Sequence, residues 1–193
     1  MKFLTLDNPC DRELELVQPA SRWIDDMVAA CQHPVSWGDT GALWTHDRLR
    51  EFVSSFPSGF EYGDELLGRS PGYYLWMRLL PKYKPPVPMA GTISLRVSDA
   101  VHIRRYSGHI GYGVFPPARG NHYAERATRL LMPLAKKHGM DHLWITCNPD
   151  NLASRRTCER LSATLVEIVD VPPGNPLYAK GDRQKCRYHL PLP

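Results

Sequence analysis

The sequence predicts an α/β fold built around one mixed sheet. Its 193 residues suit a single domain. Several short apolar or β-branched runs have the length of strands, while other segments repeat their apolar residues with the period of a helix. A strand–helix–strand unit at 110–147 implies two parallel strands joined by a right-handed crossover. We therefore expect residues 1–193 to form one domain, with largely antiparallel N-terminal strands, a central parallel strand–helix–strand unit and flanking helices.

The first half of the chain predicts antiparallel strands and two helices. Trp23 and Met27 stand at helical spacing, as do Leu49 and Phe52 further along. A stiff connection, PKYKPPVP, joins two apolar runs into a strand pair. The expected elements are strands at 14–17, 73–80 and 89–97, helices at 20–31 and 45–56, and loops at 57–72 and 98–108.

The second half has clearer boundaries. Apolar residues from Ala124 to Ala135 fall on one face of a long helix, inside which Pro133 removes a backbone hydrogen bond and predicts a kink. Gly139 has the position of a left-handed helix cap. The expected elements are strands at 109–115, 142–147, 164–169 and 185–190, and helices at 121–138 and 151–161.

Composition excludes several function classes. A formal charge of +4 is compatible with an anionic ligand, but it is too small to argue for nucleic-acid binding. The five cysteines form no CxxC pair, which favours a reducing compartment, and no His or Cys spacing is typical of a metal site. The N-terminus lacks the apolar core of a signal peptide, and no apolar run is long enough for a membrane span. We expect a cytoplasmic protein without a metal.

One segment, GYGVFPPARGNHYAERA at 111–127, carries the chemistry. A strand runs into a glycine-containing turn that opens a helix, and the first amides of a helix lack intrahelical partners and attract anions. Arg119 adds a positive charge, and Gly120 lets a backbone approach a phosphate closely. The segment therefore predicts a phosphate-binding turn, with an ordinary capped helix as the alternative.

This segment resembles the acyl-CoA-binding motif of the GNAT superfamily of N-acetyltransferases. Its closest form is the variant R-G-x-x-Y-A, matched by Arg119, Gly120, Tyr123 and Ala124, whereas Pro117 and His122 depart from the usual pattern. A second segment, TCNPDNLASRRTCERLSA at 146–163, resembles the N-x-x-S helix of the same family. The two motifs stand in the expected order, separated by a helix of the expected length.

The resemblance implies acetyl-CoA as acyl donor and a set of residues that hold it. Backbone groups of Val114 and Phe115 are expected to hydrogen-bond pantetheine, and an amide near Val114 to polarise the thioester carbonyl. Asn151 and Ser154 are expected near pantetheine or the sulfur. Arg155, Arg156 and Arg160 are alternatives for the adenosine phosphates. The residues expected at the pyrophosphate are Arg119, Gly120, Asn121, His122, Tyr123 and Ala124; the side chain of His122 either reaches a phosphate or points to solvent.

The resemblance also implies direct attack of a primary amine on the thioester in a ternary complex. His109 is the first candidate for a general base, with a structural histidine as the alternative, and Tyr112 is the second candidate. Many relatives place a proton-donating tyrosine seven residues after the helix asparagine, where this chain has Cys158. The acceptor is a small molecule or a protein N-terminus, and a homodimer is conceivable. A non-catalytic acyl-CoA-binding or sensing domain is the alternative function.

Overall fold

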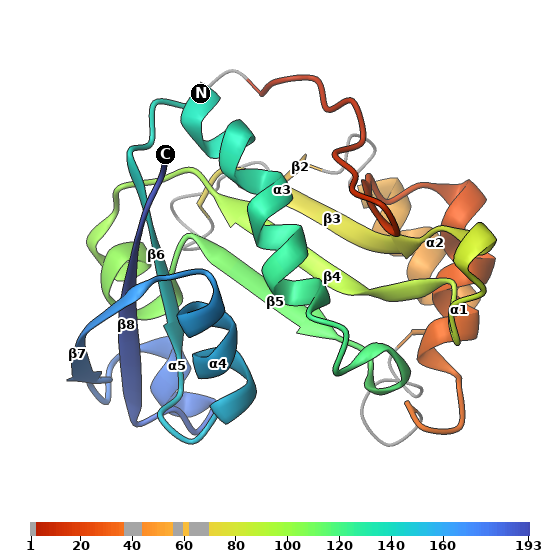
Figure 1. Cartoon of the computed structure of the whole chain (residues 1–193). Coiled ribbons are helices and arrows are strands. Elements are labelled where there is room, and N and C mark those ends of the chain that lie inside the picture. The colour runs from red at the N-terminus through yellow and green to blue at the C-terminus, as the bar shows by residue number, and fades with distance from the viewer. Residues whose placement is uncertain (1–2, 37–43, 56–59, 62–69) are drawn as a thin grey trace.

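The computed structural model describes residues 3–36, 44–55, 60–61 and 70–193. The main sheet has the strand order β1–β3–β4–β5–β6–β8–β7, and a two-residue strand, β2, pairs with β3 outside this order. All the described pairs are antiparallel except β5–β6, which is parallel. The predicted fold class is confirmed, including the parallel pair at the centre (Figure 1).

The observed elements follow the predicted order. The strands are β1 (Leu14–Val17), β2 (Phe60–Glu61), β3 (Gly72–Leu79), β4 (Met89–Arg96), β5 (Ile110–Val114), β6 (His142–Cys147), β7 (Thr164–Asp170) and β8 (Gln184–Pro191). The helices are α1 (Ile24–Cys31), α2 (His46–Ser55), α3 (Tyr123–Lys137), α4 (Leu152–Arg160) and α5 (Pro176–Ala179).

Three short elements were not predicted. Strand β2 lies in the segment that was expected to be only a loop, and a π-helical turn, Ile103–Ser107, interrupts the expected loop before β5. The four-residue helix α5 lies between β7 and β8 and begins with an Asn175 cap followed by Pro176. Each is too short to show a hydrophobic period, so residue pattern alone does not reveal it.

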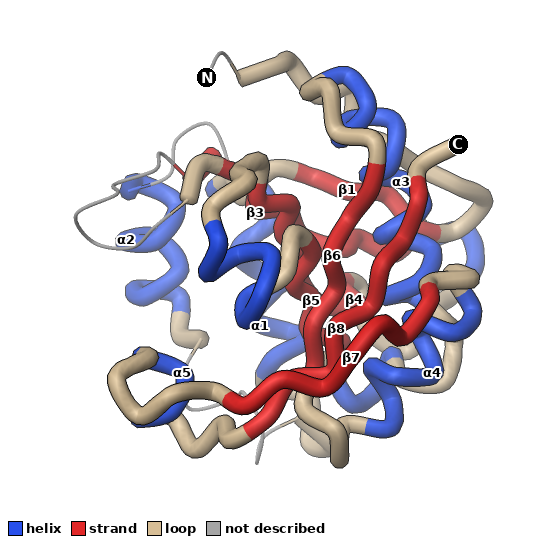
Figure 2. The backbone as a smooth tube through the Cα atoms, turned by 90° about the vertical axis from the view of Figure 1, so that its left-hand side faces the viewer, coloured by secondary structure: helices blue, strands red, loops and turns tan. Residues whose placement is uncertain are grey.

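Helices cover both faces of the sheet. Figure 2 shows α1 and α2 on one face and α3 and α4 on the other. Helix α3 buries its apolar stripe, including Ala127, Leu131 and Ala135, against the sheet and keeps Pro133 inside its span. Gly139 follows with a φ of +78°, the left-handed conformation that its position predicted. Among the described residues, no helix is both long and apolar enough to cross a membrane.

Candidate functional site

Strands β5 and β6 touch at one end and then separate. Their parallel pairing is limited to one register pair, Ile110 and Ile145. Next to this pair, the His109 amide donates a hydrogen bond to the Trp144 carbonyl at 2.6 Å. In contrast, β5 pairs with β4 along its whole length. The two central strands therefore diverge towards their C-terminal ends (Figure 1), and the next helices, α3 and α4, begin beyond this divergence.

An inner cavity of about 290 Å³ lies between the diverging strands. Its floor contains Ile110 and Ile145, the pair at which the strands still meet. Tyr112 and Cys147 line it from β5 and β6. The π-helical turn, β4, β8, α5 and the beginning of α4 also line it, so this cavity is assembled from segments far apart in the sequence.

An outer cavity of about 590 Å³ lies over the beginning of α3 and one side of α4. Residues 118–120 of the turn and residues 122–124 at the start of α3 line one wall. Three residues, Tyr112, Asn151 and Ser154, line both cavities. The two cavities therefore adjoin at these side chains. Together they extend from the start of α3 to the gap between β5 and β6, and we call the pair the cleft.

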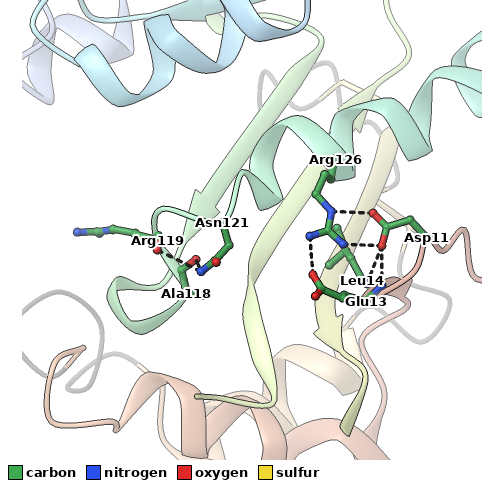
Figure 3. A network of polar contacts seen from close by, with 7 residues as sticks. All are labelled: Asp11, Glu13, Leu14, Ala118, Arg119, Asn121 and Arg126. Atoms are coloured by element: carbon green, nitrogen blue, oxygen red, sulfur yellow. Dashed lines mark hydrogen bonds and ion pairs between the residues drawn. The ribbon is translucent and has the colours of Figure 1, made fainter. Parts of the chain in front are cut away.

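The turn before α3 is braced by its own residues. The Asn121 side-chain amide donates to the carbonyls of Ala118 and Arg119 at 3.2 and 3.3 Å (Figure 3). The Arg119 Nε donates to the Val114 carbonyl at 3.1 Å. Gly120 has a φ of +88°, and a Cβ placed on it would have no atom within 4 Å. The backbone of this turn is thus fixed in shape while its surface at Gly120 stays open.

The N-terminus of α3 has the properties of an anion site. His122 caps the helix in a left-handed conformation, and its side chain makes no capping hydrogen bond. The first amides of a helix have no intrahelical acceptors, and the helix dipole places partial positive charge there. Because these amides face a cavity, they can bind the oxygens of a phosphate.

Arg126 ties the first turns of α3 to the segment before β1. Its guanidinium donates to Asp11 at 2.7 and 2.8 Å and to Glu13 at 2.8 Å (Figure 3). Burial raises the pKa of Asp11, but the hydrogen bonds from Arg126 and from the Leu14 and Glu13 amides outweigh it and hold this pKa at about 2. The carboxylate stays charged at neutral pH and fixes the start of α3 in place.

The outer cavity is lined by positive charge. Arg119, Arg156 and Arg160 all line it, and the Arg160 guanidinium lies 3.3 Å from the His122 Nε2. The prediction for the Arg155 side chain does not fit this geometry. Its guanidinium donates to the Tyr188 hydroxyl at 3.4 Å and to the Pro149 carbonyl at 3.2 Å, away from the outer cavity.

The backbone N–H groups that face the gap between β5 and β6 belong to Tyr112 and Val114, and not to Phe115. The Phe115 amide donates to the Ala90 carbonyl at 2.8 Å, and the Arg96 amide donates to the His109 carbonyl at 2.7 Å. In an antiparallel pair the intervening residues direct their N–H and C=O groups to the other side. The amides of Tyr112 and Val114 therefore face the separating β6 strand, whereas the Phe115 amide is already used.

Asn151, Ser154 and Tyr112 form a hydrogen-bonded chain where the cavities meet. The Asn151 side chain caps α4 by accepting from the Ser154 amide at 3.0 Å. The Ser154 Oγ lies 2.8 Å from the Tyr112 hydroxyl. Burial raises the pKa of Tyr112 well above its usual value, with the neighbouring Cys158 as the next cause. The Tyr112 hydroxyl therefore stays protonated at neutral pH.

His109 is held by two backbone groups. The Trp144 amide donates to its Nδ1 at 2.9 Å, and its Nε2 donates to the Ser98 carbonyl at 3.2 Å. The side chain is 1% exposed, and burial lowers its pKa to about 4. Both ring nitrogens are engaged, so a neutral His109 joins β6 to the segment after β4. This arrangement matches the structural alternative rather than a general base.

Cys147 is a functional candidate that residue patterns did not select, and among the arginines of α4 they left Arg155, Arg156 and Arg160 as alternatives. The sequence contained a signal for Cys147, because strand alternation places it on the same buried face as Leu143 and Ile145. The choice among the arginines of α4 had no such signal. Adjacent helical residues point in different directions, and only the structure shows which of them face the cavity.

Comparison with known proteins identifies the family of this chain. Residues 13–164 match the family model described as the acetyltransferase (GNAT) domain. The chain with the splayed central strand pair thus carries an acetyltransferase (GNAT) domain. The chain belongs to the GNAT acetyltransferase family and is an acyltransferase. No curated protein matches the chain in sequence.

Solved structures share the fold across nearly the whole chain. A Vibrio cholerae protein described as a ribosomal-protein-serine acetyltransferase matches with a TM-score of 0.64 and 13% identity, covering 95% of this chain and 96% of its own. The microcin C7 self-immunity acetyltransferase MccE, solved with acetyl-CoA and AMP, matches with 0.62 and 16%, covering 94% of each chain. RimL, an acetyltransferase of ribosomal protein L7/L12 solved with coenzyme A, matches with 0.61 and 18%, covering 96% and 97%.

Proposed function

We propose that this protein transfers an acetyl group from acetyl-CoA to a primary amine of low pKa, above all the α-amine of a protein or peptide N-terminus. The observation that carries the proposal is the pair of adjoining cavities, which extends from the N-terminus of α3 to the gap between β5 and β6. Its cationic outer part fits the phosphates of a coenzyme A, and its narrow inner part fits the thioester end. Acetyl-CoA supplies an activated acyl group that an amine can attack directly.

Backbone groups at the cleft hold the donor and polarise its carbonyl. The amides from Arg119 to Ala124, with Arg156 and Arg160, bind the phosphates of the coenzyme. The Val114 amide faces the gap and donates to the carbonyl oxygen, where negative charge develops as the amine attacks. Such a preorganised donor typically contributes about 3 kcal/mol to transition-state stabilisation.

Tyr112 acts as a hydrogen-bond donor to the departing sulfur. Its hydroxyl lies at the meeting point of the two cavities, and its raised pKa keeps the proton in place. A protonated hydroxyl cannot remove a proton from the amine, so Tyr112 does not act as the base. Ser154 orients the hydroxyl, and Cys158, at the position of the usual tyrosine, lies close enough to influence the Tyr112 pKa. In this chain the donor comes from β5 and not from α4.

The acceptor class follows from the state of His109. Its lone pair at Nδ1 accepts the Trp144 amide, so His109 does not take the amine proton. Obtaining the free base at pH 7 costs about 4.6 kcal/mol for a lysine amine of pKa near 10.4, but only about 1 kcal/mol for an α-amine near 7.8. An α-amine therefore reaches the attacking form without help from this histidine. RimL, a structural neighbour, is described as an α-N-protein acetyltransferase.

The proposal is tested with two peptides of matched sequence. One has a free N-terminus and no lysine, and the other has a blocked N-terminus and a single lysine next to it. Coenzyme A release and peptide mass are followed at saturating acetyl-CoA between pH 6.5 and 9.5. The α-amine peptide should react faster at pH 7, and its advantage should shrink as the pH rises and more lysine becomes free base.

Two outcomes would contradict the proposal. The first is faster acetylation of the blocked lysine peptide at pH 7, which would require a base that removes the lysine proton. The second is no acetylation of either peptide, or of small-molecule α-amines, by a preparation that binds acetyl-CoA. Binding without turnover would instead favour an acyl-CoA-sensing role.

A further inference from the structure

Three of the five cysteines gather beside the inner cavity. Cys147 ends β6, Cys186 lies directly opposite it on β8, and Cys158 lies on α4. The thiols of Cys147 and Cys158 hydrogen-bond to each other, and Cys186 interacts with Cys147. All three are free thiols and buried. They lie on the two strands and the helix that line the inner cavity together with β5.

The three thiols differ in access to the cleft. Cys147 lines the inner cavity beside Tyr112 and Ser154, whereas Cys158 and Cys186 are fully buried behind it. A small molecule that enters the inner cavity therefore meets Cys147 first.

They also differ in charge state. The hydrogen bond from Cys158 is the main cause that lowers the pKa of Cys147 to about 7, assisted by Ser154 and by the charges of Arg155 and Lys185. The pKa of Cys158 is raised by the same contact with Cys147 and by burial. At neutral pH, Cys147 is therefore the nucleophile of the pair, and Cys158 holds the proton.

We propose that Cys147 and Cys158 are a redox-active thiol pair, which a low-molecular-weight disulfide entering the inner cavity converts into an internal disulfide. The pair is not used in the transfer reaction proposed above. Oxidation gives the same cleft a second state, in which the acyl donor binds poorly.

The exchange proceeds in two balanced steps. The Cys147 thiolate attacks one sulfur of the small disulfide, a mixed disulfide forms, and one small thiolate leaves and takes up a proton. The Cys158 thiol then loses its proton and attacks the Cys147 Sγ, which releases the second small thiol. Two protein thiols are oxidised to one disulfide, and one small disulfide is reduced to two thiols.

The position of Cys158 explains why the cleft would change. Cys158 and Ser154 are four residues apart on α4 and share one helix face. A covalent bond is shorter than a thiol–thiol hydrogen bond, so it draws this face towards β6. Ser154 and its partner Tyr112 lie where the two cavities meet. We expect acetyl-CoA binding to weaken about tenfold after oxidation and to recover on reduction.

Oxidised glutathione is a suitable probe, because trypsin places the three cysteines on separate peptides. Arg155 and Arg156 separate Cys147 from Cys158, and Lys185 precedes Cys186. The full-length protein is treated with the probe, its free thiols are alkylated under denaturing conditions, and the unreduced digest is analysed by mass spectrometry. A parallel sample is titrated with acetyl-CoA before and after addition of a reductant. We expect a Cys147–Cys158 linked peptide and the reversible loss of affinity.

Cys158→Ala should abolish both the link and the loss of affinity, each variant being compared with its own reduced form. Cys31→Ala is the matched control, because Cys31 is equally buried but lies in α1, and it should behave as the wild type. Three results would overturn the proposal: a link between Cys147 and Cys186, a stable glutathione adduct on Cys147 without a link, or unchanged acetyl-CoA affinity in the linked protein. The wild-type peptide map decides the linkage even where a variant fails to fold.

Discussion

The outer and inner cavities of the cleft are built in opposite ways. The outer cavity comes largely from one continuous stretch, the turn and the first residues of α3, with helix α4 as its second wall. It offers backbone amides and arginines. The inner cavity is lined by four strands, a π-helical turn, α5 and the beginning of α4, and the groups that it presents are side chains such as Tyr112 and Cys147.

This difference indicates which of the two cavities tolerates amino-acid substitutions better. Backbone amides do not depend on the identity of the side chains at Pro117 and His122, so the outer cavity can depart from the usual motif at these two positions and still present an anion site. The inner cavity is less tolerant of substitution, because it acts through single side chains that are held in place by residues distant in sequence. We expect substitutions there to affect turnover, and substitutions in the outer cavity to affect binding.

The largest expected effect is at Tyr112, whose side chain lies where the inner cavity adjoins the outer one. Tyr112→Phe removes only the hydroxyl and should lower kcat about 100-fold, the usual range for losing a proton or hydrogen-bond donor at a reacting atom. The affinity for acetyl-CoA should change less than about twofold, because the backbone and the ring remain. Steady-state kinetics and calorimetric titration separate the two quantities.

Tyr106→Phe is the control for this change, since Tyr106 also lines the inner cavity but comes from the π-helical turn. It should reduce kcat much less than Tyr112→Phe. Equal losses in both variants, or a parallel loss of acetyl-CoA affinity in Tyr112→Phe, would remove the distinction between the cavities.

The second prediction concerns the stability that His109 contributes where β5 and β6 still pair. His109→Ala leaves the Trp144 amide and the Ser98 carbonyl without their partner and should lower the free energy of unfolding by about 2–4 kcal/mol. The pKa of His109 is about 4 when folded, below the ordinary value of 6.5. The neutral form is therefore favoured by folding, and its contribution is complete above pH 6.5 and lost as the pH falls towards 4.

Urea unfolding at pH 7 and pH 5 measures both effects. The stability difference between wild type and His109→Ala should shrink by about 1–2 kcal/mol at pH 5. If His109 were the base, the variant would instead keep its stability and lose the acidic limb of the pH–rate profile.

The third prediction concerns the contribution of the α4 arginines to acetyl-CoA binding in the outer cavity. Arg156→Ala should weaken acetyl-CoA binding about tenfold, less at high salt, because a charge-assisted contact to a phosphate is lost and such contacts are screened. Arg155→Ala is the matched control on the same helix and should leave binding unchanged, since its side chain faces Tyr188 and Pro149. A larger loss of acetyl-CoA affinity in Arg155→Ala than in Arg156→Ala would contradict this prediction and show that the other side of α4 binds the donor.

The smallest effect is expected where α3 is anchored. Asp11→Asn should destabilise the protein at pH 7 by about 1 kcal/mol, after allowance for solvent screening of this partly exposed pair. The folded pKa of Asp11, about 2, lies below the unfolded value, so this stability is present above pH 4 and lost as the pH falls towards 2. Thermal unfolding between pH 2 and pH 7 should show a weaker acid dependence in the variant, and an identical profile would contradict the assignment.

Residue patterns predicted the outer cavity better than the inner one for a physical reason. The anion-binding turn is a local structure, so Gly120 and the helix that follows it could be recognised from neighbouring residues. The chain from Tyr112 to Ser154 spans 42 positions, and the partners of His109 lie on different elements. Their distances depend on the splay of β5 and β6, which no local pattern specifies.

The placement of the donor phosphates at the N-terminus of α3 is the central claim, and one titration tests it most directly. Acetyl-CoA is titrated calorimetrically into wild type, Gly120→Glu and Gly139→Glu. Both glycines have positive φ, and a Cβ on either meets no atom within 4 Å, but they lie at opposite ends of the same helix. We predict that Gly120→Glu weakens binding at least tenfold while Gly139→Glu does not. Equal affinities in all three proteins would contradict the account.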